Sequence, residues 1–173
     1  YVSMRYNPCF RRGSLVSLWT ARDVLRGGTG ILCMDADVLY HNDLLRRLMP
    51  HRNCFLLDRN VDATEEPVRL YLQNGRPIEF RKVIMTDRPY ETMGEWPGFL
   101  RLVPESAARL ADRLDLFITA GLLDEPYEEA IRDEMLAQPH SFDIEDITGM
   151  PWIEIDFPSD VERARCEILP QLS

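Results

Sequence analysis

The 173-residue chain has no long hydrophobic run, and no apolar stretch approaches the roughly 20 residues that a membrane-spanning helix needs. Its first residues also lack the charged-then-apolar pattern of a secretory signal peptide. These two absences predict that the protein has no membrane span and resides in the cytoplasm. The chain starts at Tyr1 rather than at a methionine. We therefore expect the sequence to begin inside a longer protein.

Cysteine is scarce, and its four copies (Cys9, Cys33, Cys54 and Cys166) are far apart, with no C-x-x-C pair. Zinc sites and disulfide frameworks are therefore not expected, and reduced, buried thiols fit better. Basic residues are outnumbered: 20 Lys and Arg face 29 Asp and Glu, for a formal net charge of −9. This balance argues against binding of nucleic acid or anionic membranes. An anionic substrate would need metal ions or local basic residues beside it.

What the chain does contain is an alternation of strand and helix patterns, with enough apolar residues (45%) for a core. The turn pair Asn74-Gly75 is a strong hairpin signal in the middle of the chain. We expect strands at 1–6, 31–34, 54–57, 68–72, 77–83, 99–103, 142–147 and 152–155, and helices at 15–25, 44–49, 104–118, 125–136 and 158–169. This order predicts a Rossmann-like, layered α/β fold in a single domain over residues 1–173: a mixed sheet with helices on both faces and an antiparallel hairpin insertion.

Two aspartates stand at the end of the apolar run 31–34, in the stretch CMDADVLYHNDLLRRL. Residues two apart in a strand face the same side, so Asp35 and Asp37 are expected to point at one site beyond the strand end. Carboxylate oxygens with few other ligands suit Mg²⁺. The simpler alternative is that one aspartate caps the following helix and the other is solvated.

A second acidic strand end occurs in GMPWIEIDFPSDVERA, where Glu154 and Asp156 close an apolar strand before a helix that begins at a proline. Two such ends, far apart in sequence, are expected to meet across one cleft and share a cation. Helix capping by Asp156 is compatible with metal ligation, so the two interpretations do not exclude each other.

Taken together, these stretches resemble the sugar-nucleotidyltransferase-like enzymes, and within them the phosphocholine cytidylyltransferase type. YNPCFRRGSLVSLWTARDVL, GRPIEFRKV, GEWPGFLRL, PYEEAI and PWIEIDFPSDVERA follow in the expected order. The resemblance implies a Mg²⁺-dependent reaction in which a phosphomonoester oxygen attacks the α-phosphate of a nucleoside triphosphate, most simply CTP, and pyrophosphate leaves. It implies metal binding by Asp37 and Asp156, with Asp35 and Glu154 as supporting or alternate ligands. Lys82 matches a basic residue near the reacting phosphates.

The acceptor implied by the resemblance is a small phosphorylated alcohol such as phosphocholine. A choline headgroup would be recognised by aromatic faces and carboxylates, through cation–π and ionic attraction. Trp96 beside Glu95, and Tyr127 beside Glu128, provide both residue types. We therefore expect these four residues at the acceptor site, while ordinary core packing is the alternative for the two aromatic residues.

The chain departs from the family in one respect: the glycine-rich loop that cradles the triphosphate, with its arginine and lysine, has no match here. We expect that the N-terminal part of the enzyme is missing from this sequence. Two other interpretations therefore stay open. One is a catalytically inert binding domain with the same fold, and the other is a glycosyltransferase whose D-x-D holds Mn²⁺ and a nucleotide-sugar.

Overall fold

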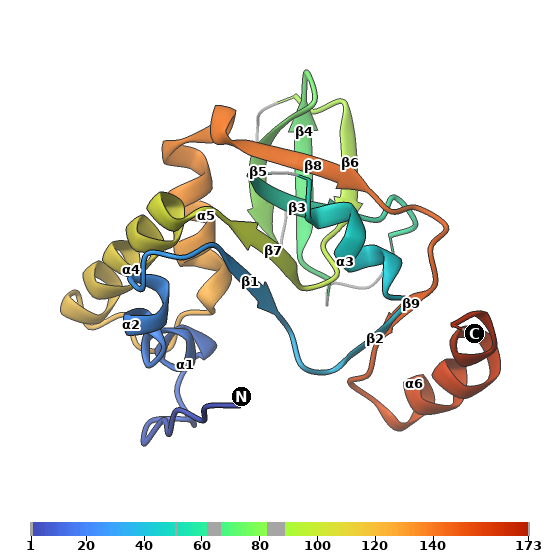
Figure 1. Ribbon diagram of the computed structural model, residues 1–173, viewed down its shortest axis with the longest axis horizontal. Helices are drawn as coiled ribbons and strands as arrows, with labels where there is room; N and C mark the ends of the chain where they lie inside the picture. Colours follow the sequence, from blue (N-terminus) through green and yellow to red (C-terminus); the bar gives the residue numbers. More distant parts are fainter. Residues whose placement is uncertain (1, 51, 62–66, 83–88, 173) are drawn as a thin grey trace.

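A four-stranded mixed sheet forms the centre of the molecule (Figure 1). The computed structural model describes residues 2–50, 52–61, 67–82 and 89–172. In the central sheet β7 is antiparallel to both of its neighbours, whereas β3 and β8 run parallel. The predicted mixed sheet is confirmed. Its strands, in spatial order, are β1 (Ile31–Met34), β7 (Phe99–Leu102), β3 (Asn53–Leu57) and β8 (Phe142–Asp146).

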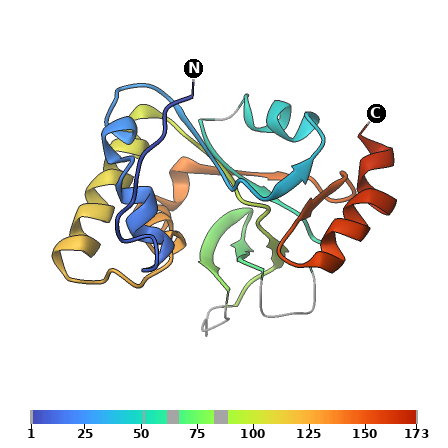
Figure 2. The ribbon, with the colours of Figure 1, turned by 90° about the horizontal axis from the view of Figure 1, so that it is seen from below.

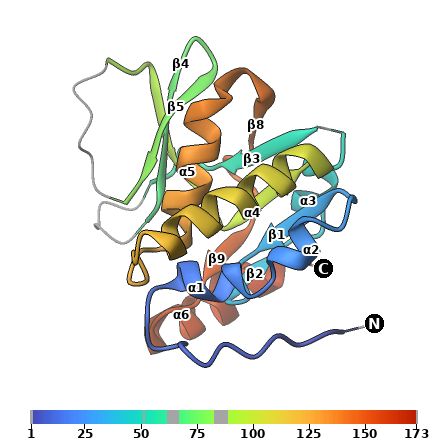
Figure 3. The same cartoon turned by 90° about the vertical axis from the view of Figure 1, so that its left-hand side faces the viewer.

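Helices cover both faces of this sheet, as the sequence predicts. Phe55 and Leu57 of β3 belong to a core cluster with residues of the helices on one face, while Cys54 and Leu56 pack with the single helix on the other. This split follows from the strand's alternation, because successive side chains point to opposite faces. The first face carries α1 (Ser14–Trp19), α2 (Arg22–Leu25), α4 (Pro104–Thr119) and α5 (Tyr127–Ala137), seen in front of the sheet in Figure 3, and the second carries α3 (Asp43–Leu48).

The predicted hairpin forms part of a separate three-stranded sheet. Its strands, in the order β5-β4-β6, are β5 (Arg76–Arg81), β4 (Arg69–Gln73) and β6 (Thr92–Glu95). Asn74 and Gly75 connect β4 to β5 with φ angles of 50° and 67°. Positive φ at both positions is the requirement of a type I′ turn, which explains why this pair of residues was a good hairpin signal.

A two-stranded ladder joins the first and last thirds of the chain. β2 (Val38–Tyr40) pairs antiparallel with β9 (Trp152–Glu154), and α6 (Pro158–Arg163) follows directly. After α6 the chain continues through a π-helical turn (Ala164–Ile168) and a 3₁₀ turn (Leu169–Gln171), and another 3₁₀ turn (Pro139–Ser141) precedes β8. The ladder and α6 lie at the opposite end of the molecule from α1, α2 and α4 (Figure 2).

Several expected elements differ from the structure. Residues 2–6 form no strand, and Tyr1 lies outside the described residues. The expected helix 15–25 is two helices, because the chain turns at Thr20-Ala21. β5 ends at Arg81, and Val83 is again outside the described residues. Among the described helices, none is both long and apolar enough to cross a membrane.

Candidate metal and substrate site

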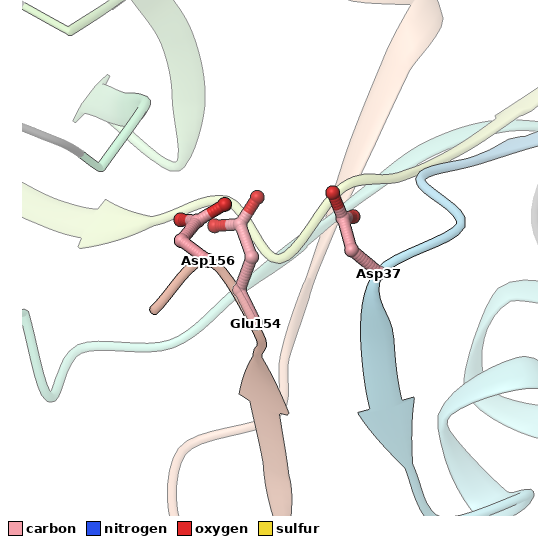
Figure 4. Close-up of side chains that lie close together, drawn as sticks. All are labelled: Asp37, Glu154 and Asp156. Carbon is pink, nitrogen blue, oxygen red and sulfur yellow. The ribbon is translucent and has the colours of Figure 1, made fainter. Parts of the chain in front are cut away.

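Three carboxylates converge where the β2–β9 ladder ends. Asp37 directly precedes β2, Glu154 is the last residue of β9 and pairs with Val38, and Asp156 follows two residues later. The ladder is extended by a hydrogen bond from the Ile155 N–H to the Asp37 carbonyl oxygen (2.9 Å). One oxygen from each carboxylate lies within 4.8 Å of the other two, and Figure 4 shows the side chains gathered at one end of the two strands. The two acidic strand ends therefore meet, as expected from the sequence.

In this group, which we call the carboxylate triad (Asp37, Glu154 and Asp156), the charged form of Glu154 is disfavoured. Partial burial, together with repulsion from Asp156 and Asp37, raises the pKa of Glu154 to about 7. Within the described residues, no arginine or lysine forms an ion pair with a member of the triad. Three hard oxygen donors at this spacing, exposed to solvent, suit a divalent cation such as Mg²⁺ that also keeps water or phosphate ligands. The residues present thus fit the metal that the resemblance implies.

Asp35 is not a member of the triad and has a hydrogen-bond partner of its own. The Tyr127 hydroxyl donates to its two carboxylate oxygens (2.7 and 2.8 Å), and the Asp35 N–H donates to the Gly98 carbonyl oxygen (3.1 Å). Gly98 has φ +83°, and a Cβ there would lie 2.6 Å from Asp35 Oδ2. Because β1 ends at Met34, the two-residue alternation of a strand does not extend through Asp37. Asp35 is therefore not one of the three carboxylates that converge, although its charge is near enough to contribute to the raised pKa of Glu154.

Lys82 lies among the acidic groups of the site. It is exposed, directly after β5, and its positive charge lowers the pKa of Asp35, Glu128 and Glu154, opposing the larger raising effect of burial on each. Among the described residues it forms no ion pair within 4 Å with any of these carboxylates. Its charge therefore acts on these carboxylates without a close ion pair to any of them.

Glu128 presents an unusual carboxylate. Its Oε2 atom is buried and has no hydrogen-bond partner, and burial raises the pKa of the side chain. Leaving a buried carboxylate oxygen without a donor costs free energy, so such a group commonly marks a site that a ligand completes. The sequence placed Glu128 at the acceptor site only because of its neighbour Tyr127.

The two aromatic residues expected at the acceptor site, Trp96 and Tyr127, make contacts within the protein. Trp96 is only 5% exposed and packs in the core, and its indole N–H donates to the Phe99 carbonyl oxygen (2.8 Å). Its ring meets that of Tyr127 edge-on, with 6.2 Å between centroids. Trp96 therefore supports Tyr127, which in turn holds Asp35. Glu95 lies elsewhere, at the end of β6.

Glu95 lines a cavity of about 370 Å³ that also reaches Glu154 and Asp156. Its wall includes Asp58, whose Oδ2 accepts a hydrogen bond from the Trp152 indole N–H (2.8 Å). Asp58 and Trp152 were not among the site residues predicted from the sequence. A usable signal existed for Asp58, because it ends an apolar strand just as the other acidic residues of the site do.

Comparison with known proteins identifies the fold. No protein-family model matches the sequence, and no curated protein matches it. Solved structures do match. The inositol-1-phosphate CTP transferase from T. maritima aligns with a TM-score of 0.65 at 14% identity, over 92% of this chain and 62% of its own.

Two further structures give the same result. A putative glucose-1-phosphate thymidylyltransferase from Bacillus anthracis aligns with a TM-score of 0.62 at 16% identity, over 88% of this chain and 59% of its own. The CTP:phosphocholine cytidylyltransferase from Streptococcus pneumoniae aligns with a TM-score of 0.60 at 15% identity, over 88% of this chain and 62% of its own. The chain therefore has the nucleotidyltransferase fold and spans about three fifths of the length of these enzymes.

Proposed function

We propose that this chain carries the metal-binding and acceptor-binding part of a nucleotidyltransferase, which transfers a nucleotidyl group, cytidylyl in the simplest case, to a small phosphorylated molecule. The observation that carries the proposal is the convergence of Asp37, Glu154 and Asp156 beside a cavity. The shared fold with solved nucleotidyltransferases supports the same reaction class.

In the proposed reaction, a phosphate oxygen of the acceptor forms a bond to the α-phosphorus of the nucleotide while the bond from that phosphorus to pyrophosphate breaks. This chemistry depends on positioning and charge neutralisation rather than on a covalent nucleophile. A bound Mg²⁺ would neutralise charge on the phosphate oxygens. The triad would hold this ion, and Lys82 would attract and help to orient an anionic phosphate.

For the acceptor we propose a molecule with a positively charged headgroup, such as phosphocholine. The support comes from Glu128, whose buried Oε2 lacks a partner, and from Tyr127 and Asp35 beside it. A cationic headgroup would compensate these carboxylates, whereas a neutral sugar would leave them uncompensated. Trp96 is not a direct contact in this proposal, because it is buried behind Tyr127.

Titration calorimetry with Mg²⁺, or with Mn²⁺ as a probe, tests the metal site without requiring turnover. We expect Asp37→Asn and Asp156→Asn each to weaken cation binding at least about tenfold, because each removes one charged ligand. Asp112→Asn is the matched control, since this exposed aspartate pairs with Arg26 on the surface of α4. Equal affinity in the wild type and the two triad variants would refute the site.

A substrate panel separates the proposed reaction from its alternatives. CTP, UTP, ATP and GTP are combined with phosphocholine, other phosphorylated alcohols and sugar phosphates, and pyrophosphate release is measured. Release with CTP and a cationic acceptor supports the proposal. Cation binding without release under any combination supports an inert binding domain, and Mn²⁺-dependent sugar transfer from a nucleotide-sugar supports a glycosyltransferase.

A further inference from the structure

The β2–β9 ladder, which carries the carboxylate triad, is a sheet of its own. In the described part of the chain it shares no strand pairing with the central sheet or with the β5-β4-β6 sheet (Figure 1). The ladder packs on the central sheet through apolar contacts, among them the edge-on contact of Tyr40 with Phe99 of β7, with 4.8 Å between ring centroids. Because the hydrophobic effect is non-directional, such packing fixes the place of a strand less sharply than a directed hydrogen bond does.

Asp58 lies at the junction of all three sheets. It directly follows β3 of the central sheet and is only 6% exposed. Its backbone N–H and C=O both bond to Glu95 of β6 (2.9 and 2.7 Å), which ties the central sheet to the three-stranded sheet. Its Oδ2 atom accepts the hydrogen bond from the Trp152 indole N–H (2.8 Å), which ties the central sheet to the ladder.

The Asp58 carboxylate is held in one orientation. Its other oxygen, Oδ1, accepts a hydrogen bond from the Asn60 N–H (2.9 Å), in the local pattern that binds an aspartate side chain to its own turn. Both carboxylate oxygens therefore have a donor, and Oδ2 faces Trp152. Hydrogen bonds to carboxylates are among the stronger ones in proteins, so this contact constrains where the indole lies.

Trp152 connects Asp58 to two members of the triad. Trp152 and Glu154 are two residues apart in β9, so their side chains project from the same side of the strand. Both line the cavity of about 370 Å³, together with Asp58 and Asp156. A displaced indole would therefore shift the end of β9, and Glu154 and Asp156 with it.

The third member of the triad is held by a different part of the molecule. Asp37 comes two residues after Asp35, whose N–H donates to the Gly98 carbonyl oxygen beside β7 (3.1 Å). The hydrogen bond from the Ile155 N–H to the Asp37 carbonyl oxygen joins this segment to the end of β9. The spacing within the triad thus depends on two separately held segments meeting at this bond.

We propose that Asp58 is a positioning residue for the triad: by holding the Trp152 indole, it fixes β9 so that Glu154 and Asp156 meet Asp37 at the spacing a divalent cation needs. This inference rests on the metal-binding role proposed above. Asp58 acts through Trp152 rather than on the cation itself. Groups behind the ligands contribute to metal affinity because they orient the ligands, and Asp58 has this role one strand away from the ion.

Trp152→Phe tests the proposal, because it removes the indole N–H and keeps both an aromatic ring and the charge of the site. Titration calorimetry of the folded variant should show Mn²⁺ binding weakened about fivefold, less than when a ligand itself is removed. Trp19→Phe is the matched control, since the Trp19 indole N–H donates to Asp115 of α4 (2.7 Å). Both variants lose one indole–aspartate hydrogen bond, but only Trp152→Phe should change the affinity for the cation.

Amide hydrogen exchange tests the positioning without any cation. In the wild type the Trp152 indole N–H should be protected, a measurement that needs no variant. The Ile155 amide should exchange at least about threefold faster in Trp152→Phe and at an unchanged rate in Trp19→Phe. Asp58→Ala should accelerate the same amide, and adding Trp152→Phe to it should cause no further increase, because both substitutions remove one and the same hydrogen bond.

The outcomes separate this proposal from the proposed function. Wild-type protein that binds no Mn²⁺ refutes the metal site, whereas the exchange rate of the Ile155 amide still decides whether Asp58 positions β9. The positioning role is overturned by an unprotected Trp152 indole, by equal Ile155 exchange in the wild type and Trp152→Phe, or by effects of Asp58→Ala and Trp152→Phe that add. If the wild type binds Mn²⁺, an unchanged affinity in Trp152→Phe overturns it as well.

Discussion

Two glutamates in this molecule have opposite electrostatic surroundings. Glu79 in β5 is 7% exposed, yet its pKa is lowered, because hydrogen bonds from Arg132 and from the Phe80 N–H outweigh the cost of burial. Glu154 in the triad is exposed, yet its pKa is raised to about 7 by partial burial and by the neighbouring aspartates. A carboxylate that supports the fold has its own arginine, whereas among the described residues no arginine or lysine forms an ion pair with the triad.

Asp35 is an intermediate case. Its partner is the neutral hydroxyl of Tyr127, which stabilises the carboxylate without compensating its charge. The pKa of Asp35 remains raised because burial and the nearby Asp37 outweigh this hydrogen bond and the attraction of Lys82. Three classes of carboxylate, paired with a cation, with a neutral donor or with neither, can therefore be compared by substitution.

The largest effect is expected for Glu79→Gln. This substitution removes the carboxylate that pairs most closely with the largely buried Arg132, leaving only Asp133 at 4.0 Å, and should destabilise the fold by about 3 kcal/mol, measured by urea denaturation at pH 7. Since the folded pKa of Glu79 is lowered, its contribution is fully present above the unfolded pKa near 4.5 and is lost as the pH falls further. Glu162→Gln, which removes an exposed pair with Arg165, is the control and should cost less than about 0.5 kcal/mol. Equal losses in the two variants would contradict the comparison.

A smaller loss is expected for Tyr127→Phe. It removes the hydroxyl that donates to both oxygens of the half-buried Asp35 and should cost about 1.5 kcal/mol by the same measurement. The pKa of Asp35, followed by NMR, should rise further, because the hydrogen bond that favours its ionised form is gone. Tyr6→Phe is the control, since Tyr6 is 83% exposed. An unchanged pKa of Asp35 would show that Tyr127 does not stabilise its charge.

The smallest effect, and one of opposite sign, is expected for Glu154→Gln in the absence of divalent cations. Between pH 4.5 and about 7 the folded state binds more protons at Glu154 than the unfolded state does, so the charged side chain lowers stability as the pH rises through this window. The substitution should therefore stabilise the protein at pH 8 by about 1 kcal/mol, after allowance for solvent screening, and have no effect below pH 4.5. Glu167→Gln, on an exposed turn, serves as control. Destabilisation at pH 8 would show that Glu154 is already compensated.

The sequence predicted best those elements whose own residues carry a clear local signal. The apolar run ending in Asp35, the Asn74-Gly75 turn and the proline at the start of α4 predicted β1, the hairpin and the helix. The convergence of Asp37 and Asp156 was also predicted, because both follow strands whose ends bind ligands in this class of fold.

Elements that depend on distant partners were not predicted. β2 is only three residues long and exists through its pairing with β9, more than 100 residues later. β6 reads Thr-Met-Gly-Glu, with little strand pattern, and its Gly94 is required because a Cβ there would lie 2.5 Å from Leu57 Cγ. Residues 2–6 show the reverse: they alternate like a strand, but Val2 and Met4 stay more than 90% exposed. Local pattern cannot reveal whether a partner strand is present.

The register of the β2–β9 ladder has a consequence for how the protein reaches its native state. Val38 opposes Glu154, and a slip of one residue would turn every side chain of β9 to the other side of the ribbon. In misaligned chains, only some of the triad carboxylates would lie at the proposed metal site. Mg²⁺ added during refolding should therefore stabilise only the molecules in which β2 and β9 pair in the native register, and so favour correct pairing of these two strands.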